Sequence, residues 1–233
     1  MAKPADQSEP KASTAEPGVI TVGRKPVVLV YFLLLTGVLL AGDLWLKAWS
    51  FEHIADHPIR LESSADGPVV FLYLAHPLTG DQGWHRADDV YINLKPGVVP
   101  PHDSTRLVPK ALDLQLTLNT GAVFGLGKGA RPVFIVVSLV ATAVIFFLLW
   151  RSPARGYLYH IALAMILAGA LGNLYDRVRF AAVRDMLHML PEAGLWPWIF
   201  NFADVTLVVG VCLVLLLSFL SERRQRIAES TSG

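Results

Sequence analysis

The chain has 233 residues, of which 53% are hydrophobic and 17% charged, and its formal net charge at pH 7 is +1. This hydrophobic content is high for a soluble domain, and the near-neutral charge argues against an electrostatic nucleic-acid binder. The only cysteine, Cys212, excludes an intrachain disulfide and a multi-cysteine metal site.

Four apolar stretches are long enough to cross a membrane, since about 20 helical residues span roughly 30 Å of hydrocarbon. They predict spans over residues 26–49, 132–150, 157–175 and 198–220. Residues 1–25 are predicted to be a disordered tail, because they are rich in Ala, Pro, Ser and Glu. The membrane domain then covers residues 26–220, and residues 221–233 form a second tail.

The distribution of basic residues predicts the orientation of the spans. Basic residues precede the first span, lie in the short second connection and follow the fourth span: Lys3, Lys11, Arg24, Lys25, Arg151, Arg155, Arg223, Arg224 and Arg226. By the positive-inside rule, both termini are cytoplasmic. The loops over residues 50–131 and 176–197 therefore face outward.

The first span contains two charged residues near its outer end. Asp43 and Lys47 are four residues apart and share a helix face, and Asp43 lies roughly 25 Å along the helix from Pro26. One interpretation is an interfacial ion pair whose lysine snorkels outward and serves only packing. The other is a supporting role beneath a functional site.

The outer segment after the first span is too long for an ordinary connection. It contains the strand-like runs "VVFLYLAH", "DVYINL" and "LDLQLTLN", separated by Pro and Gly clusters. These predict a small extracytoplasmic β-sheet that ends in the turn-like run "NTGAVFGLGKGA".

The second and third spans are predicted to form a helical hairpin around "RSPARG". The third span ends in "LAGALGNLYDRVR", in which Asn173 and Arg177 share a face. These two side chains could bind a substrate carbonyl or orient a carboxylate. The alternative is a buried helix-helix amide beside a snorkelling arginine.

The last outer loop runs from Asp185 through a short amphipathic segment, predicted to lie in the membrane interface. Trp196 and Trp198 mark the re-entry into the membrane. Asp204 then lies roughly 9 Å below the outer surface, with Asn201 on the same face. A carboxylate favoured by the helix dipole is the structural alternative for Asp204.

Asp43, Asn173 and Asp204 come from three spans, yet these depths place them all near the outer face of the membrane. Ionisable groups within a span are costly and indicate a functional site. Two neighbouring carboxyl groups cannot both ionise easily, so the pair shares a proton. If Asp185 pairs with Asp204, one carboxyl group can activate water while the other polarises a peptide carbonyl.

Other chemistries have no matching pattern in the sequence. The seven histidines show no H-E-x-x-H or comparable metal spacing, and there is no G-x-S-x-G elbow. Neither a metal nor a cofactor is predicted.

Five motifs resemble those of the bacterial lipoprotein signal peptidase (signal peptidase II) family of aspartic endopeptidases. They are "DLWLK", "NTGAVFG", "GNLYDR", "VRD" and "FNFAD", in the family's order. The resemblance implies a catalytic dyad of Asp185 and Asp204. It implies supporting or substrate-binding roles for Asp43, Lys47, Asn119, Gly121, Asn173, Asp176, Arg177 and Asn201.

The chain also departs from the family pattern. Ala181 stands where the family usually has glycine, and Met186 stands where it usually has phenylalanine. The outer segment between Lys47 and Asn119 is much longer than usual, which indicates an insertion.

The sequence thus predicts a membrane all-α protein with a small β element. It has four transmembrane helices, cytoplasmic termini, a β-sheet cradle outside the membrane and an interfacial amphipathic segment. The resemblance implies a monomeric enzyme of the bacterial inner (cytoplasmic) membrane that removes signal peptides from diacylglyceryl-modified prolipoproteins near the extracytoplasmic face. The alternatives are a proton-coupled transporter, for which internal repeats and ionisable groups at mid-depth are missing, and a non-catalytic lipoprotein-binding protein.

Overall fold

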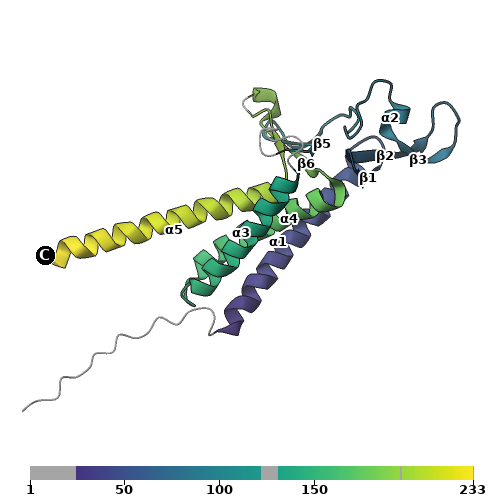
Figure 1. Ribbon diagram of the computed structural model, residues 1–233. Coiled ribbons are helices and arrows are strands. Elements are labelled where there is room, and N and C mark those ends of the chain that lie inside the picture. Colours follow the sequence, from purple (N-terminus) through teal and green to yellow (C-terminus); the bar gives the residue numbers. More distant parts are fainter. Residues whose placement is uncertain (1–24, 122–130, 195, 233) are drawn as a thin grey trace, which may run out of the picture.

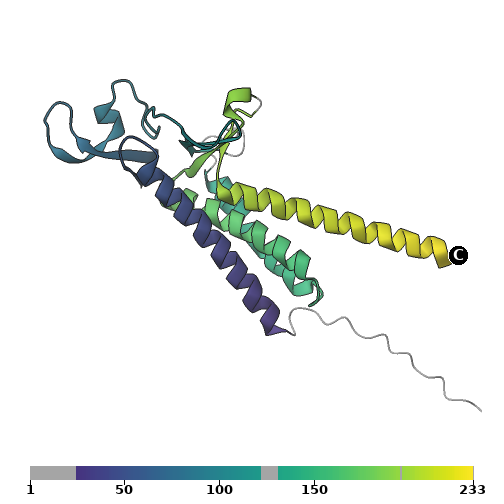
Figure 2. The same ribbon diagram turned by 180° about the vertical axis from the view of Figure 1, so that it is seen from behind.

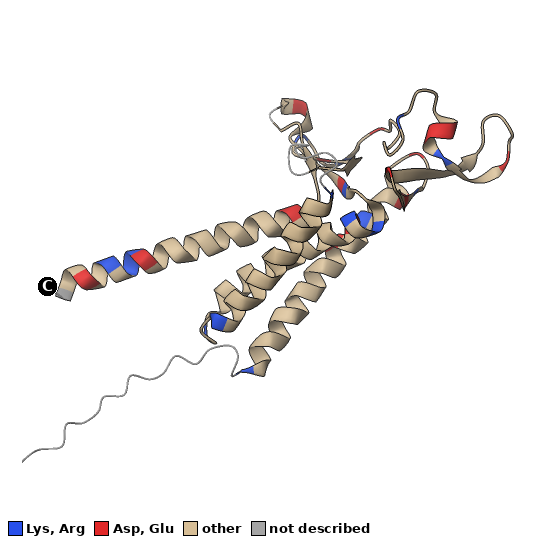
Figure 3. Cartoon of the chain, in the orientation of Figure 1, with Lys and Arg blue, Asp and Glu red and all other residues tan. Residues whose placement is uncertain are grey.

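The computed structural model describes residues 25–121, 131–194 and 196–232. Four of its helices are long and apolar enough to cross a membrane, which confirms the predicted number. They are α1 (Pro26–His53), α3 (Arg131–Arg151), α4 (Tyr157–Phe180) and α5 (Phe202–Ser232). Their charged residues gather near the helix ends, so that the middle stretches are free of charge (Figure 3).

Helix α4 is the centre of the helical part and packs against α1, α3 and α5. Half of its apolar stretch is buried, compared with 22% or less in the other three. Figures 1 and 2 show α1 and α3 running beside α4, while α5 diverges from them toward its C-terminal end. A residue on α4 can therefore contact groups from two or three other elements, which makes α4 the natural support for a polar site.

The helices α4 and α5 approach each other closely because small residues lie at their contact. A Cβ atom added to Gly169 would lie 2.4 Å from the carbonyl oxygen of Ala203, and one added to Gly210 would lie 2.8 Å from that of Ala162. Close backbone approach through small residues is a common way to pack helices in membranes. This packing fixes the N-terminal end of α5 against α4.

The ends of three helices differ clearly from the predicted spans. Helix α1 continues to His53 instead of ending at residue 49, and α5 continues to Ser232 instead of residue 220, so residues 221–232 of the predicted second tail are helical. Helix α4 continues to Phe180 instead of ending at residue 175, and α5 begins at Phe202 instead of residue 198. Residues 198–201 were placed in the span because Trp198 and Ile199 are apolar, but the side chain of Asn201 caps the helix that begins after them. The later start places Asp204 in the first turn of α5.

The strands form two antiparallel sheets outside the helices, where a single sheet was predicted. One has the order β1-β2-β3 and the other β4-β5-β6-β7. The strands are β1 (Ile59–Ser64), β2 (Gly67–Ala75), β3 (Gln82–Arg86), β4 (Thr105–Val108), β5 (Leu112–Asn119), β6 (Val183–Met189) and β7 (Ile199–Phe200). The first sheet belongs to the long insertion and extends away from the C-terminal end of α1 (Figure 1).

Two of the three predicted strands are confirmed and one is wrong. "VVFLYLAH" corresponds to β2 and "LDLQLTLN" to β5, but "DVYINL" begins in a helical turn, α2 (Ala87–Val90), and continues without regular structure. Asp88 and Asp89 lie in the first turn of α2, where acidic residues favour a helix. The arginine preceding this turn also pairs with Asp88, at 2.7 Å.

The predicted amphipathic interfacial segment is also wrong, because its first half is strand β6. This strand is hydrogen-bonded to β5 on one side and to β7 on the other, so it lies inside the sheet. Met186 and Leu187 are both buried although they point to opposite faces. A strand that is covered on both faces has no alternation of polar and apolar residues. Its apolar residues can therefore be mistaken for the apolar face of a short amphipathic segment.

The chain turns from α4 into β6 through Ala181, which has a left-handed conformation with φ 61°. This is the position at which the family pattern has glycine. Glycine adopts such a conformation without the Cβ clash that alanine suffers. The turn nevertheless sets the start of β6, and with it the position of Asp185 two residues into the strand.

Substituting Ala181→Gly is therefore expected to raise the free energy of unfolding by about 0.5–1 kcal/mol, because relief of the left-handed strain, about 1–2 kcal/mol, outweighs the loss of one buried methyl group. The measurement is an unfolding titration in detergent micelles. Ala182→Gly is the matched control, since Ala182 is buried and does not have a positive φ, and it should lower the stability. Equal destabilisation by both variants would contradict the assigned strain.

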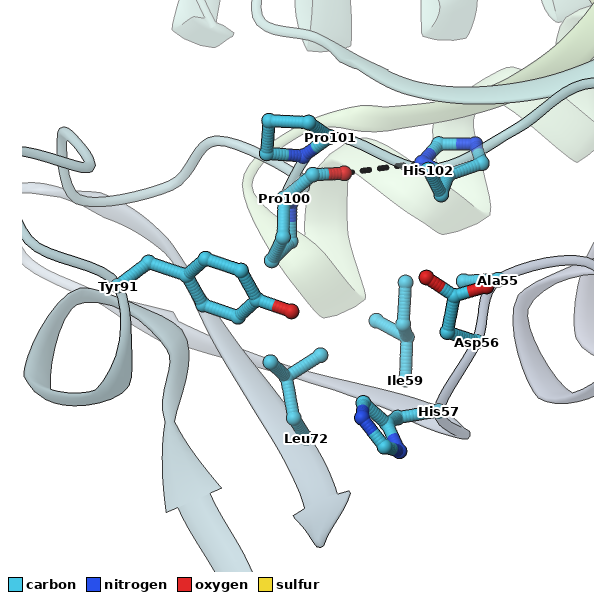
Figure 4. A pocket seen from close by; sticks show the side chains of 9 residues that line it. All are labelled: Ala55, Asp56, His57, Ile59, Leu72, Tyr91, Pro100, Pro101 and His102. Carbon is cyan, nitrogen blue, oxygen red and sulfur yellow. Dashed lines mark hydrogen bonds between the residues drawn. The ribbon is translucent and has the colours of Figure 1, made fainter. Parts of the chain in front are cut away.

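The insertion is attached to β5 through His102. The imidazole Nδ1–H donates to the carbonyl of Pro100 at 2.9 Å (Figure 4), and Nε2 accepts the backbone N–H of Leu116 in β5 at 2.9 Å. The crevice beside this contact, which Asp56 and Tyr91 help to line, has a volume of only about 10 Å³, room for about one water molecule. It is a packing contact and is too small for a peptide.

Candidate active site

Asp185 lies on β6 opposite Thr117 of β5, and only 1% of it is exposed. Its Oδ1 accepts a hydrogen bond of 2.5 Å from the side-chain amide of Asn201, and the side chain of Asn119 forms a further hydrogen bond to it. The residue was expected in a solvated loop unless it paired with Asp204. The sheet instead holds it in a nearly dry position above the helices.

Asp204 is the third residue of α5 and forms a reciprocal hydrogen-bond pair with Asn201. The backbone N–H of Asp204 donates to the side-chain oxygen of Asn201 at 3.0 Å, and the backbone N–H of Asn201 donates to Asp204 Oδ2 at 3.2 Å. This is the arrangement of a capping box. One interpretation of Asp204 was a carboxylate that stabilises the start of a helix. The structure agrees with it, since the carboxylate caps α5.

Capping occupies only one oxygen of Asp204. The other, Oδ1, accepts a hydrogen bond of 2.7 Å from the side-chain amide of Asn173 on α4. Because each oxygen accepts an N–H group, the orientation of the carboxylate is fixed.

Asn201 connects the two aspartates directly. Its amide nitrogen donates to Asp185, its amide oxygen accepts from the backbone of Asp204, and the same nitrogen also donates to the oxygen of Asn173 at 3.1 Å. One buried amide thus positions a carboxyl group from a strand beside a carboxyl group from a helix, although they are 19 residues apart in the sequence.

Beneath this pair, Lys47 is completely buried and contacts three acceptors. Its ammonium lies 2.8 Å from Asp43 Oδ2, 3.5 Å from Asp176 Oδ2 and 3.2 Å from the amide oxygen of Asn173. The interpretation of Lys47 as an interfacial side chain that snorkels outward is therefore wrong. The lysine instead fixes the amide of Asn173, whose nitrogen must then point at Asp204.

Asp43 has a second function besides its ion pair, because its Oδ1 accepts the backbone N–H of Ala203 at 2.8 Å. Ala203 is the second residue of α5, so a carboxylate from α1 caps the helix that carries Asp204. Gly172 on α4 makes this approach possible, since a Cβ there would lie 2.4 Å from Asp43 Oδ2. This explains physically why glycine precedes Asn173 in the motif "GNLYDR".

Asp176 anchors the start of β6 through Arg184, a residue that the sequence analysis did not select. The Arg184 guanidinium lies 2.8 Å from Asp176 Oδ1, and its backbone N–H donates to Oδ2 at 3.0 Å. Arg184 and Asp185 are consecutive in a strand and point to opposite faces. Arg184 is part of the run "VRD", but it was not selected, because an arginine in a loop is usually exposed to solvent.

Arg177 contacts no carboxylate in the described part of the chain, although orienting a carboxylate was one of its predicted roles. Its guanidinium donates to the carbonyl of Gly121 at 3.0 Å and lies 4.8 Å above the ring of Phe134. The backbone N–H of Gly121 in turn donates to the side-chain oxygen of Asn119 at 3.0 Å. Arg177 therefore holds the end of β5 beside Asp185; residues 122–125 of "NTGAVFG" lie outside the described residues.

The electrostatic environment of Asp185 favours its protonated form. Burial raises the pKa of Asp185 to about 7, and the neighbouring Asp204 charge adds to this rise, while the hydrogen bonds from Asn201 and Asn119 and the charge of Lys47 oppose it. Near neutral pH, Asp185 can therefore hold a proton that it can give to a substrate. A carboxyl pair in which one member is kept protonated is suited to general acid-base chemistry.

Comparisons with known proteins identify the family of the chain. The family described as signal peptidase (SPase) II matches residues 89–220, which is more than half of the chain. The chain is 38% identical over 127 residues to a protein named lipoprotein signal peptidase from Desulfitobacterium hafniense, covering 54% of this chain and 82% of that protein.

Another protein of the same name, from Deinococcus radiodurans, is 31% identical over 208 residues and covers 86% of this chain and 82% of its own length. A solved structure described as a bacterial membrane enzyme has a TM-score of 0.48 and 26% identity, over 52% of this chain and 73% of that one. The family match and the extent of the similarity to these relatives lead to one conclusion: the chain belongs to the signal peptidase II family of membrane proteases.

Proposed function

We propose that this protein is an aspartic endopeptidase in which Asp185 and Asp204 together activate water. One observation supports this proposal most strongly: the side chain of Asn201 hydrogen-bonds to Asp185 at 2.5 Å and to the backbone of Asp204 at 3.0 Å. The pair is thus held together by a rigid buried group, and the hydrogen bonds of Asn173 and Lys47 extend this support to α1 and α4.

The environments of the two carboxyl groups suggest different roles. Asp204, whose two oxygens accept N–H groups, takes a proton from water as the water oxygen attacks the scissile carbonyl carbon. Asp185, with its raised pKa, donates its proton to the carbonyl oxygen, which gives a neutral gem-diol. Asp204 then passes its proton to the leaving nitrogen as the C–N bond breaks, and a gem-diol hydroxyl returns a proton to Asp185.

The proposed substrate is a prolipoprotein whose cysteine carries a diacylglyceryl group, and cleavage occurs just before that cysteine. The names of the relatives support the substrate class. The basic residues beside the cytoplasmic helix ends support cytoplasmic termini and a site at the outer face of the bacterial inner membrane. The proposed enzyme is a monomer whose membrane domain covers residues 26–220, with tails on either side.

The test is cleavage of a lipidated precursor by the purified protein in proteoliposomes. The precursor with an unmodified cysteine is the control, and it should be cleaved far more slowly. If neither precursor were cut, although the lipidated one bound, the protein would be a lipoprotein-binding relative without activity. Proton movement on addition of a solute, without cleavage, would indicate a transporter.

The activity is also expected to depend on pH through Asp185. The mechanism needs the protonated form of Asp185, so kcat/KM should fall about tenfold per pH unit as the pH rises above about 7. Substituting Asn119→Ala removes a hydrogen bond that favours the ionised form of Asp185, so the pKa should rise and the alkaline limb should move to higher pH. A profile that stays flat to pH 9 in the unmodified protein would exclude Asp185 as the acid.

A further inference from the structure

An open groove of about 650 Å³ lies on the side of α4 that faces away from the aspartates. Its apolar lining consists of Leu40 on α1 and Leu171, Leu174 and Val178 on α4. These α4 positions recur at spacings of three and four residues and so form one helix face. Asn173, Asp176 and Arg177 occupy the opposite face, so the groove is separate from the proposed active site.

The groove is apolar along the helices and polar at its outer end. Arg179, the last groove residue on α4, lies eight residues beyond Leu171, or about 12 Å along the helix. Ser63, at the end of β1 in the insertion, also lines the groove. The groove therefore has a long apolar part within the span and a cationic end at the level where lipid headgroups lie.

Arg179 differs from the other arginines near this end of the helices. Arg184 is paired with Asp176, while Arg177 and Arg131 donate to the carbonyls of Gly121 and Val178. The guanidinium of Arg179 lies 5.4 Å from the centre of the Phe180 ring, and none of the ion pairs among the described residues joins Arg179 to a carboxylate. It is exposed and keeps its donors available for an anion.

We propose that this groove binds a diacyl phospholipid, with one acyl chain along Leu171, Leu174 and Val178 and the phosphate on Arg179. A guanidinium suits a phosphate by charge and by its planar set of donors, and the apolar lining suits a hydrocarbon chain. The insertion contributes Ser63 to the same groove, so the bound lipid connects the extra sheet to α4. Because α4 carries the asparagine that orients Asp204, the lipid braces the helix behind the active site.

The experiment is native mass spectrometry of the full chain released from detergent after titration with dioleoyl phosphatidylglycerol. The unmodified protein should keep one lipid under conditions that remove the others. Arg179→Ala should weaken retention of that lipid by about tenfold, the effect of about one charge-assisted hydrogen bond. The matched control is Arg60→Ala, because Arg60 is an exposed arginine of the insertion that is paired with Glu62 and is absent from the groove; it should keep the lipid.

A second variant tests the apolar part of the groove without changing any charge. Val178→Trp fills the groove and should also release the lipid, while circular dichroism checks that both variants remain folded. Glycerol phosphate, which lacks acyl chains, should not displace the bound lipid; displacement would mean a site for free phosphate and would overturn the proposal. Equal retention by the unmodified protein and by both variants would show adventitious annular lipid only, and would also overturn it.

Discussion

Replacing Asp185 or Asp204 by asparagine is expected to lower the rate of cleavage of a lipidated precursor by about 10³-fold or more, since general acid-base groups contribute up to about 10⁴-fold each. The two single variants should lose similar amounts of activity, and the double variant should lose little more, because the pair acts as a unit. The measurement is the initial rate in proteoliposomes with the lipidated precursor.

Asparagine is the right substitution because it preserves the shape of each side chain. In Asp204→Asn the amide oxygen can still cap α5 by accepting the N–H of Asn201, now 3.2 Å from Asp204 Oδ2, so the helix should still begin at Phe202, although the hydrogen bond from Asn173 to Oδ1 is lost. The matched control is Asp113→Asn, which changes a buried carboxyl group of β5 that hydrogen-bonds Ser104 outside the site. Full activity in either dyad variant, or an equal loss in the control, would contradict the proposed roles.

The transmembrane part of the fold was predictable from the sequence because the membrane imposes a simple rule. Every backbone group within the hydrocarbon must be hydrogen-bonded internally, so a long apolar stretch is a helix. The ends of the helices were less predictable. Trp198 and Ile199 are as apolar as the span that follows them, and only the side chain of Asn201 shows where α5 begins.

The sheet was only partly predictable, because strand β6 owes its structure to its neighbours. Its residues Val183–Met189 pair with β5, which lies far earlier in the sequence, and with β7. The pattern of residues within β6 itself gives no information about which strands pair with it. The same limitation applies to His102, whose imidazole fixes the insertion to Leu116 but looks like any loop histidine in the sequence.

The site residues were selected from their positions in the spans and from the motifs, and the structure adds physical reasons for them. Charge spacing suggested that Asp43 and Lys47 pair, but it could not show that the pair is buried and that Asp43 also caps α5. Spacing also gave no sign that Arg184 holds Asp176, since that contact depends on the turn at Ala181. Burial and capping are properties of the assembled fold, so they appear only when α1, α4 and α5 are in place.

The buried charges beneath the site lead to a second large effect, on stability. Lys47→Met is expected to lower the free energy of unfolding by about 3–5 kcal/mol, the usual cost of removing one partner from a buried charge network. The ammonium lies 2.8 Å from Asp43 and 3.5 Å from Asp176, with none of the lysine exposed. Asp176 would keep its contact with Arg184, whereas Asp43 would lose its only ion pair among the described residues.

The measurement for Lys47→Met is an SDS unfolding titration in mixed micelles, with Lys95→Met as the control because Lys95 lies on an exposed loop. The double variant Lys47→Met with Asp43→Asn should recover part of the lost stability, because it removes the orphaned charge while an amide oxygen can still accept the N–H of Ala203. Activity should not recover with stability, since the amide of Asn173 has lost the donor that fixes its orientation toward Asp204. If Lys47→Met unfolded at the same SDS concentration as Lys95→Met, the lysine would not be the cation that holds these helices together.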